Sequence, residues 1–465
     1  MSLFRLQIGV CLLVLVCGQI LFWRRRDNVL GYVQGGLFLG TFLLPLLGTS
    51  VTEQFSSDVV QLYSTILLVG AIAYLAGLCF GAPMGNRRAR PAPLTFIEPL
   101  DSGDTFKLIL VRTRILAIVG MGSLLAAYAI LGYVPILAAD RVSAKYGVGP
   151  YAASFARGAI PYNFALAVVS TALPVILVLL FRRRRLLDLC LAGGLLLGLI
   201  MSLSRTLAFS GVLLFVVALA FERRIRPFII LAMVTGSFIA GALINEIFFP
   251  PQGGGSETLA SRVAASAPDI QEQLGFLRGF ELRGEVRRGW ALVGGLAFGR
   301  GDLDPASYTV RTITGFDNVD SFPSGGLRLP APIWGFVSFG LIGAGLWSFL
   351  SGFFTGWGTT RLRNLLTSVK DAPGSSLNLV LAAVFYAGTF GVVSTFYFAT
   401  SSMFVRVAIA LYLGRFLMGP KRYREITRGA GLDGLPSPSA ASRFPPQPIG
   451  GNGSRVRAPG RYQKG

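Results

Sequence analysis

The stretch "LAGGLLLGLIMSLSRTLAFSGVLLFVVALAF", residues 191–221, is almost wholly apolar and carries a single arginine, Arg205, near its middle. An unpaired arginine at the centre of a bilayer costs about 3 kcal/mol on insertion scales. The position of Arg205 relative to the membrane therefore has to be determined first. The apolar run begins at residue 186, and as one helix it would be about 54 Å long, against a hydrocarbon core about 30 Å thick. Arginine clusters flank both ends of the run. We therefore predict two helices joined by a tight turn at "SLSRT", residues 202–206, which moves Arg205 to a membrane face.

The rest of the chain shares this apolar character. Its 465 residues are 52% hydrophobic and 14% charged, and the mean hydropathy is +0.61. The apolar residues form blocks of about 18 or more, which predicts an all-α, polytopic membrane protein with about 11 transmembrane helices. The predicted spans are residues 4–23, 29–49, 59–81, 115–135, 163–181, 186–203, 206–221, 227–249, 331–353, 375–398 and 402–418. Arginines follow the first span instead of preceding it, which indicates a retained span and not a cleaved signal peptide.

The excess of positive charge lies in one set of loops. The net charge is +21, and the basic runs lie directly against apolar blocks, at residues 24–27, 87–90, 182–185, 222–226, 361–363 and 421–424. With the N-terminus outside and the C-terminus inside, every one of these runs falls on the cytoplasmic side, as the positive-inside rule requires. The excess charge is therefore topological, and we expect no nucleic acid as partner.

Two predicted outer loops are long, residues 136–162 and 250–330. The second contains a segment with helical spacing of apolar residues, 269–298, which predicts an amphipathic helix lying on the membrane near an anionic ligand, or alternatively a lid or packing helix. We assign residues 1–429 to one transmembrane domain. Residues 430–465 are rich in Pro, Ser, Gly and Arg, and this composition predicts a disordered, basic cytoplasmic tail.

Arginines at the predicted outer face are the candidate anion-binding residues. The guanidinium group donates two parallel hydrogen bonds to a phosphate and keeps its charge, so a cluster could hold a lipid-linked pyrophosphate. The alternative is that these arginines contact phospholipid head groups or snorkel from helix ends. Besides Arg205, the candidates are Arg141, Arg157, Arg287, Arg328 and Arg406. The candidate acids are Asp140, beside Arg141, and Glu246, near the outer end of the eighth span.

The sequence offers no pattern for a metal or a cofactor. It contains no histidine, and its four cysteines lie in apolar blocks without metal-ligand spacing. The ninth span is rich in glycine, at Gly335, Gly340, Gly343 and Gly345, which predicts close helix packing or a groove for an isoprenoid chain.

Three separated stretches resemble the bacterial O-antigen polymerase family, the oligosaccharide repeat-unit polymerases. They are "GYVPILAADRVSAKYG" (132–147), "SLSRTLAF" (202–209) and "LPAPIWGFVSFGLIGAGLWSF" (329–349). The resemblance implies a multi-pass protein of the bacterial cytoplasmic (inner) membrane. It also implies a GT-C type glycosyltransferase that works without metal or cofactor, and that polymerises lipid-linked repeat units into a cell-surface polysaccharide.

In that reading the donor and the acceptor are both polyprenyl-pyrophosphate-linked oligosaccharides at the outer face of the membrane. Arg205 and Arg141 would stabilise the departing pyrophosphate, with Arg157, Arg287, Arg328 and Arg406 as further substrate-binding residues. Asp140, or else Glu246, would accept the proton of the attacking hydroxyl. Membrane lipids, a repeat-unit flippase and a chain-length regulator are the other expected partners.

Three alternatives stay open at this point: a non-catalytic membrane assembly factor and the two that follow. An O-antigen ligase resembles the polymerases in topology, but such ligases typically depend on a histidine in the large outer loop, and this chain has none. A lipid or oligosaccharide flippase or transporter is the second alternative. Such proteins usually consist of repeated halves with broken helices near the midplane, whereas no internal repeat is visible in this sequence.

Overall fold

The computed structural model describes the parts of the chain that carry most of the predicted spans. The described residues are 2–22, 52–87, 104–147, 149–204, 268–283, 305–315, 329–366 and the shorter pieces 39, 43, 46, 207, 211, 212, 215, 226, 228–236, 239, 327, 408, 409, 412, 413 and 415–417. Within them every regular element is a helix, and no strand occurs. Four stretches are long and apolar enough to cross a membrane: Ser57–Gly85, Lys107–Leu131, Ser143–Phe181 and Ala331–Gly358. The predicted all-α membrane fold is confirmed to this extent, while the count of eleven spans and their orientation remain predictions.

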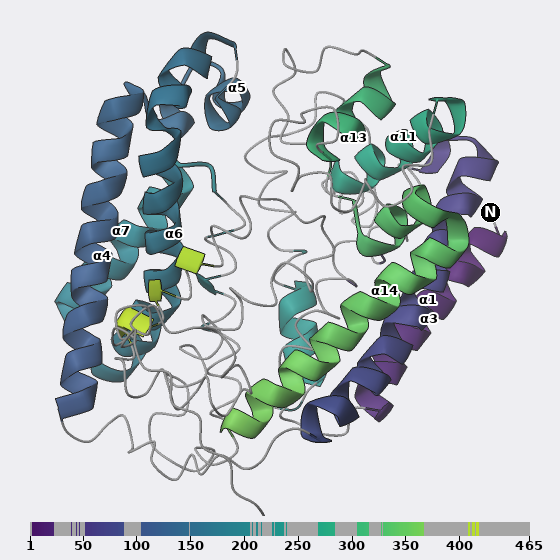
Figure 1. Ribbon diagram of the computed structural model, residues 1–465, viewed down its shortest axis with the longest axis horizontal. Coiled ribbons are helices and arrows are strands. Elements are labelled where there is room, and N and C mark those ends of the chain that lie inside the picture. The colour runs from purple at the N-terminus through teal and green to yellow at the C-terminus, as the bar shows by residue number, and fades with distance from the viewer. Residues whose placement is uncertain are drawn as a thin grey trace, which may run out of the picture.

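The helices form two groups that stand side by side in Figure 1. One group contains α4 (Asp104–Leu131), α6 (Ala152–Arg183) and α7 (Leu186–Met201), each of which packs on the other two. Its core comes mainly from α6, where Val168, Ala172 and Ile176 are almost fully buried. A helix that is apolar on nearly all faces, as α6 is in this part, belongs in the middle of a bundle.

The other group contains α1 (Ser2–Phe22), α3 (Ser57–Arg87) and α14 (Ala331–Leu366). Glycines bring α3 and α14 into backbone contact: a Cβ on Gly81 would lie 2.0 Å from the carbonyl oxygen of Phe353, and Gly77 meets Phe349 in the same way. Glycines four residues apart let membrane helices approach this closely. These close contacts come from glycines of α3 that were not part of the prediction, whereas a Cβ on the predicted Gly345 of α14 would be in ordinary contact with Val69 of α3.

The ninth span is not one straight helix. Non-helical backbone at Phe339 and Gly340 interrupts α14, and a Cβ on Gly335 would lie 2.1 Å from the carbonyl oxygen of Gly343. Residues eight apart in a straight helix are about 12 Å apart along the axis, so this contact means that the first part of α14 folds back on the second. Gly340 has φ +66° and ψ −156°, a combination that essentially only glycine adopts.

Helices α11 (Pro268–Arg283) and α13 (Pro305–Thr314) pack on each other, and α11 also packs on α3. The buried Gln273 of α11 accepts a hydrogen bond of 2.6 Å from the Tyr63 hydroxyl of α3. Arg283 donates to the carbonyl oxygens of Thr312 and Ile313, where α13 ends. The first half of the predicted amphipathic segment is therefore a helix that packs on α3 and α13, whereas residues 284–298 lie outside the described part.

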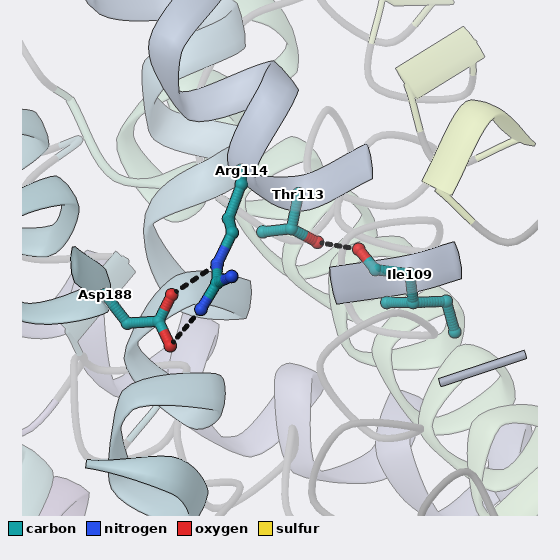
Figure 2. A network of polar contacts seen from close by, with 4 residues as sticks. All are labelled: Ile109, Thr113, Arg114 and Asp188. Atoms are coloured by element: carbon teal, nitrogen blue, oxygen red, sulfur yellow. Dashed lines mark hydrogen bonds and ion pairs between the residues drawn. The ribbon is translucent and has the colours of Figure 1, made fainter. Parts of the chain in front are cut away.

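Helices α4 and α6 both begin well before the predicted spans at 115–135 and 163–181. Arg114 lies just outside the predicted fourth span but inside α4. In the structure Arg114 makes two hydrogen bonds to Asp188 of α7, Nε to Oδ1 at 2.8 Å and Nη2 to Oδ2 at 3.0 Å (Figure 2). Asp188 is fully buried. This pairing, between residues 74 positions apart, compensates the charge of Arg114 within α4.

Candidate functional site

The candidate site is the end of the first group where α4 ends, α6 begins and α7 ends. The segment that joins α4 to α6, residues 132–151, covers this end and is called the α4–α6 connection below. It contains η5 (Pro135–Leu137), α5 (Arg141–Tyr146) and η6 (Gly149–Tyr151). Figure 1 shows α5 above α4 and α6, and α11 and α13 at the same end of the second group.

Aromatic side chains fix the α4–α6 connection in place. The Tyr133 hydroxyl donates a 3.0 Å hydrogen bond to the carbonyl oxygen of Ala144, and the Tyr133 ring lies 4.7 Å from that of Tyr151, centroid to centroid. Gly147, with φ +66°, lies so close to Phe155 of α6 that a Cβ would be 2.1 Å from the ring. Burial raises the pKa of Tyr133 above its usual value, and Tyr151 adds to the effect. A tyrosine hydroxyl is protonated at neutral pH in any case, so Tyr133 serves as a hydrogen-bond donor here.

Asp140, the predicted base, has a structural role in this connection. Its Oδ1 accepts a 3.0 Å hydrogen bond from the backbone N–H of Ser143, and its carbonyl oxygen accepts one from Ala144. Asp140 is thus the N-cap of α5. The side chain is exposed, so the cap leaves the carboxylate accessible from outside the protein.

Arg141 and Arg157 are the two predicted anion-binding residues that the structure describes. Arg141 is the first residue of α5 and Arg157 lies near the start of α6, and both side chains are exposed. Arg157 makes only a long contact, 3.4 Å from Nε to the carbonyl oxygen of Ala153. Within the described part of the chain neither guanidinium has an ion-pair partner, so both are available to an anionic ligand.

The sequence "SLSRT" is a helix end, as predicted. After Met201, Leu203 adopts a left-handed conformation with φ +54°. The N–H of Leu203 donates a hydrogen bond to the carbonyl oxygen of Ile200, and the N–H of Ser204 donates one to the carbonyl oxygen of Leu199. These are the two hydrogen bonds of a Schellman motif, which terminates a helix.

Two tyrosines hold this turn against α4 and α6. The Tyr128 hydroxyl is 2.6 Å from the Ser202 Oγ, and the Tyr162 hydroxyl donates a 3.1 Å hydrogen bond to the Ser202 carbonyl oxygen. Ser202 is buried. The turn is therefore bonded to both neighbouring helices before the chain reaches Arg205.

The chain then reverses along α6. A Cβ on Gly211 would lie 2.7 Å from Leu173 of α6, and the Phe215 ring lies 6.2 Å from that of Phe181, further along the same helix. Residues 211 and 215 therefore follow α6 in its own direction, opposite to that of α7. The described residues thus show that the chain turns back after α7, as predicted, whereas the second helix of the hairpin remains a prediction and Arg205 itself lies outside the described residues.

Four other predicted site residues also lie outside the described part: Glu246, Arg287, Arg328 and Arg406. The structure therefore brings Asp140 and Arg141 together on one short helix, with Arg157 on the helix that follows, and leaves the remaining assignments as predictions. Sequence reasoning missed the tyrosines that hold the turn. The signal for them was weak, because a tyrosine next to an apolar block is equally typical of a membrane interface.

Comparison with protein families, with curated proteins and with solved structures finds no match. The resemblance to the O-antigen polymerases therefore rests on the three sequence stretches and on the predicted layout of the spans.

Proposed function

We propose that this protein polymerises lipid-linked oligosaccharide repeat units at the outer face of a bacterial cytoplasmic membrane. The observation that carries the proposal is the reversal of the chain after α7. It leaves Ser204 at the same end of the first helix group as Arg141 and Arg157, and Arg205 is the next residue in the chain. Three arginines at one end of a bundle suit a lipid-linked pyrophosphate, whose charge lies at the head-group level.

In the proposed reaction a hydroxyl of the acceptor oligosaccharide attacks the anomeric carbon of the donor chain. The bond from that carbon to the pyrophosphate oxygen breaks, a glycosidic bond forms, and polyprenyl pyrophosphate departs with the bonding electron pair. The proton of the attacking hydroxyl passes to a base. The arginines lower the barrier by stabilising the charge that develops on the leaving pyrophosphate, in a site that is formed before the reaction starts.

Asp140 is the proposed base, and its structural role calls for a substitution that separates the two functions. Asparagine caps a helix about as well as aspartate but cannot take up a proton. Asp140→Asn should therefore leave α5 folded and the protein stable while polymerisation falls at least about 100-fold, the lower range for loss of a general base. Asp140→Ala removes both functions and serves as the comparison. Full activity of Asp140→Asn would remove Asp140 from the mechanism and leave Glu246 as the candidate.

The experiment on the function itself uses the purified full chain with a lipid-linked repeat unit and no nucleotide sugar. The expected product is a ladder of glycans that differ by one repeat unit. Arg205→Ala should abolish the ladder without loss of protein from the membrane. Arg226→Ala is the matched control, since Arg226 is exposed and belongs to a basic run predicted on the other side. Transbilayer movement of the lipid without any ladder would refute the polymerase and favour the flippase.

A further inference from the structure

A cavity lies at the end of the first helix group opposite to the candidate site, about 30 residues along α6. Its volume is about 440 Å³, within the usual range for small-molecule sites. The walls are apolar and come from three segments: Leu180 and Phe181 at the end of α6, Leu189 in the first turns of α7, and Phe215. Two arginines, Arg184 and Arg185, complete the lining.

The two arginines form the link between α6 and α7. Arg184 has φ +48°, and its N–H donates to the carbonyl oxygen of Leu180, which ends α6 in a left-handed cap. Arg185 is extended and precedes the first residue of α7. The left-handed conformation costs about 1 kcal/mol for a residue with a side chain. Glycine is the usual residue at such a position, so the cap geometry alone does not require arginine.

Both arginines combine exposure with a place in the cavity lining. Arg184 and Arg185 are exposed and yet line it, and within the described residues neither has an ion-pair partner. The site thus joins an apolar interior to two adjacent positive charges, at the end of the helices that the positive-inside rule assigns to the cytoplasm. A ligand that matches both parts has a hydrocarbon chain and an anionic head.

We propose that this cavity binds an anionic phospholipid. One acyl chain lies between Phe181, Leu189 and Phe215, and the head-group phosphate lies against Arg184 and Arg185. Basic pockets between membrane helices on the cytoplasmic side are typical sites for such lipids. A zwitterionic phospholipid would bring its own positive charge to the arginines, and inorganic phosphate has nothing to fill the apolar part. The proposal does not depend on the polymerase function, because the two sites lie at opposite ends of α6.

The experiment measures lipid retention by the full-length protein in detergent micelles, by native mass spectrometry, with phosphatidylglycerol and phosphatidylcholine offered in equal amounts. Wild-type protein should retain phosphatidylglycerol in preference. In the double variant Arg184→Ala/Arg185→Ala its affinity should fall about 30-fold, the effect of two arginines at an anionic head group. The matched control is Arg183→Ala/Arg226→Ala, which removes two exposed charges that do not line the cavity and should leave the preference intact.

Leu189→Trp tests the apolar half of the site while both arginines stay in place. Leu189 is 54% exposed, so a larger side chain there can fill the cavity without disturbing the core, and retention of phosphatidylglycerol should fall in this variant too. Equal retention of the two lipids by wild-type protein would overturn the proposal. So would unchanged retention in the variant lacking Arg184 and Arg185, or in Leu189→Trp, because the lipid would then bind elsewhere.

Discussion

The buried ion pair between Arg114 and Asp188 predicts an unequal response to removal of its two partners. The Asp188 carboxylate is 0% exposed, whereas the Arg114 side chain is 18% exposed. Replacement of Arg114 by leucine leaves a carboxylate that has no access to solvent. Replacement of Asp188 by leucine leaves a guanidinium that can turn towards the head groups or water, as long arginine side chains do.

Removal of one partner from a buried pair costs about 3–5 kcal/mol, mostly because the other charge stays buried without compensation. We expect Arg114→Leu to reduce the free energy of unfolding by about that amount, which multiplies the unfolded fraction by roughly 10² to 10⁴. Asp188→Leu should cost about 1 kcal/mol or less, since Arg114 retains access to water. The double variant should recover most of the loss, because an apolar pair of similar volume is often neutral or stabilising.

The assay is reversible unfolding of the purified protein in mixed micelles titrated with a denaturing detergent, followed by circular dichroism. Arg226→Leu is the control: this exposed arginine should change the stability by no more than about 0.5 kcal/mol. Equal losses in Arg114→Leu and in the double variant would refute the reasoning, because the cost would then come from lost packing of the arginine stem. A larger loss in Asp188→Leu than in Arg114→Leu would refute it as well.

Three further substitutions test the packing. Gly81→Ala should cost about 1–3 kcal/mol in the same assay, since α3 and α14 must separate, whereas Gly122→Ala, where a Cβ meets nothing within 4 Å, should leave the stability unchanged or raise it. Tyr162→Phe should cost about 1 kcal/mol through loss of its hydrogen bond to the α7 turn. Tyr412→Phe, at a side chain 71% exposed, should cost nothing measurable. Gly340→Ala should lower the free energy of unfolding by about 1–3 kcal/mol from backbone strain alone. If Gly340→Ala lowered it no more than Gly122→Ala does, the result would contradict the tight reversal in α14.

The hairpin after α7 could be predicted from the sequence because its cause is local. Length, apolar content and flanking arginines together left room only for two short helices between residues 186 and 221. The structure ends the first of these at Met201, two residues from the predicted end at 203. The exact residue at which α7 ends could not be predicted. The left-handed position that ends a helix is usually a glycine, but here it is Leu203.

The starts of α4 and α6 could not be predicted in the same way, because their causes are not local. Arg114 is paired inside the bundle with Asp188, which lies on another helix. For α6, residues 152–162 were predicted to belong to an outer loop, yet they are the start of the helix, and Pro161 lies inside it. Neighbouring helices of a bundle can satisfy the backbone groups that such a proline leaves without a hydrogen bond. Those neighbours are tertiary contacts, which the sequence around Pro161 does not specify.

The regularly spaced glycines of α3 and α14 could be predicted in part. Their spacing on α3 and α14 is visible in the sequence and predicts close approach, but it does not name the partner. Gly335 and Gly343 show the difference clearly, because spacing of this kind predicts contact with another helix, whereas the two residues approach each other across the reversal at Gly340. The spacing of glycines predicts that one face of a helix is flat. Which element packs against that face depends on the tertiary structure.

The hydrogen bonds that end α7 also determine how activity data should be interpreted. The turn is held by backbone groups of Leu203 and Ser204 and by Tyr128 and Tyr162, and none of these hydrogen bonds uses the side chain of Arg205. Arg205→Ala should therefore remove a charge while the described turn stays in place, whereas Tyr162→Phe loosens the turn and keeps the charge. If only the charge matters, the first variant loses polymerisation and the second keeps it. If the position of the charge matters as well, as a preorganised anion site requires, both lose activity, and Tyr162→Phe loses less.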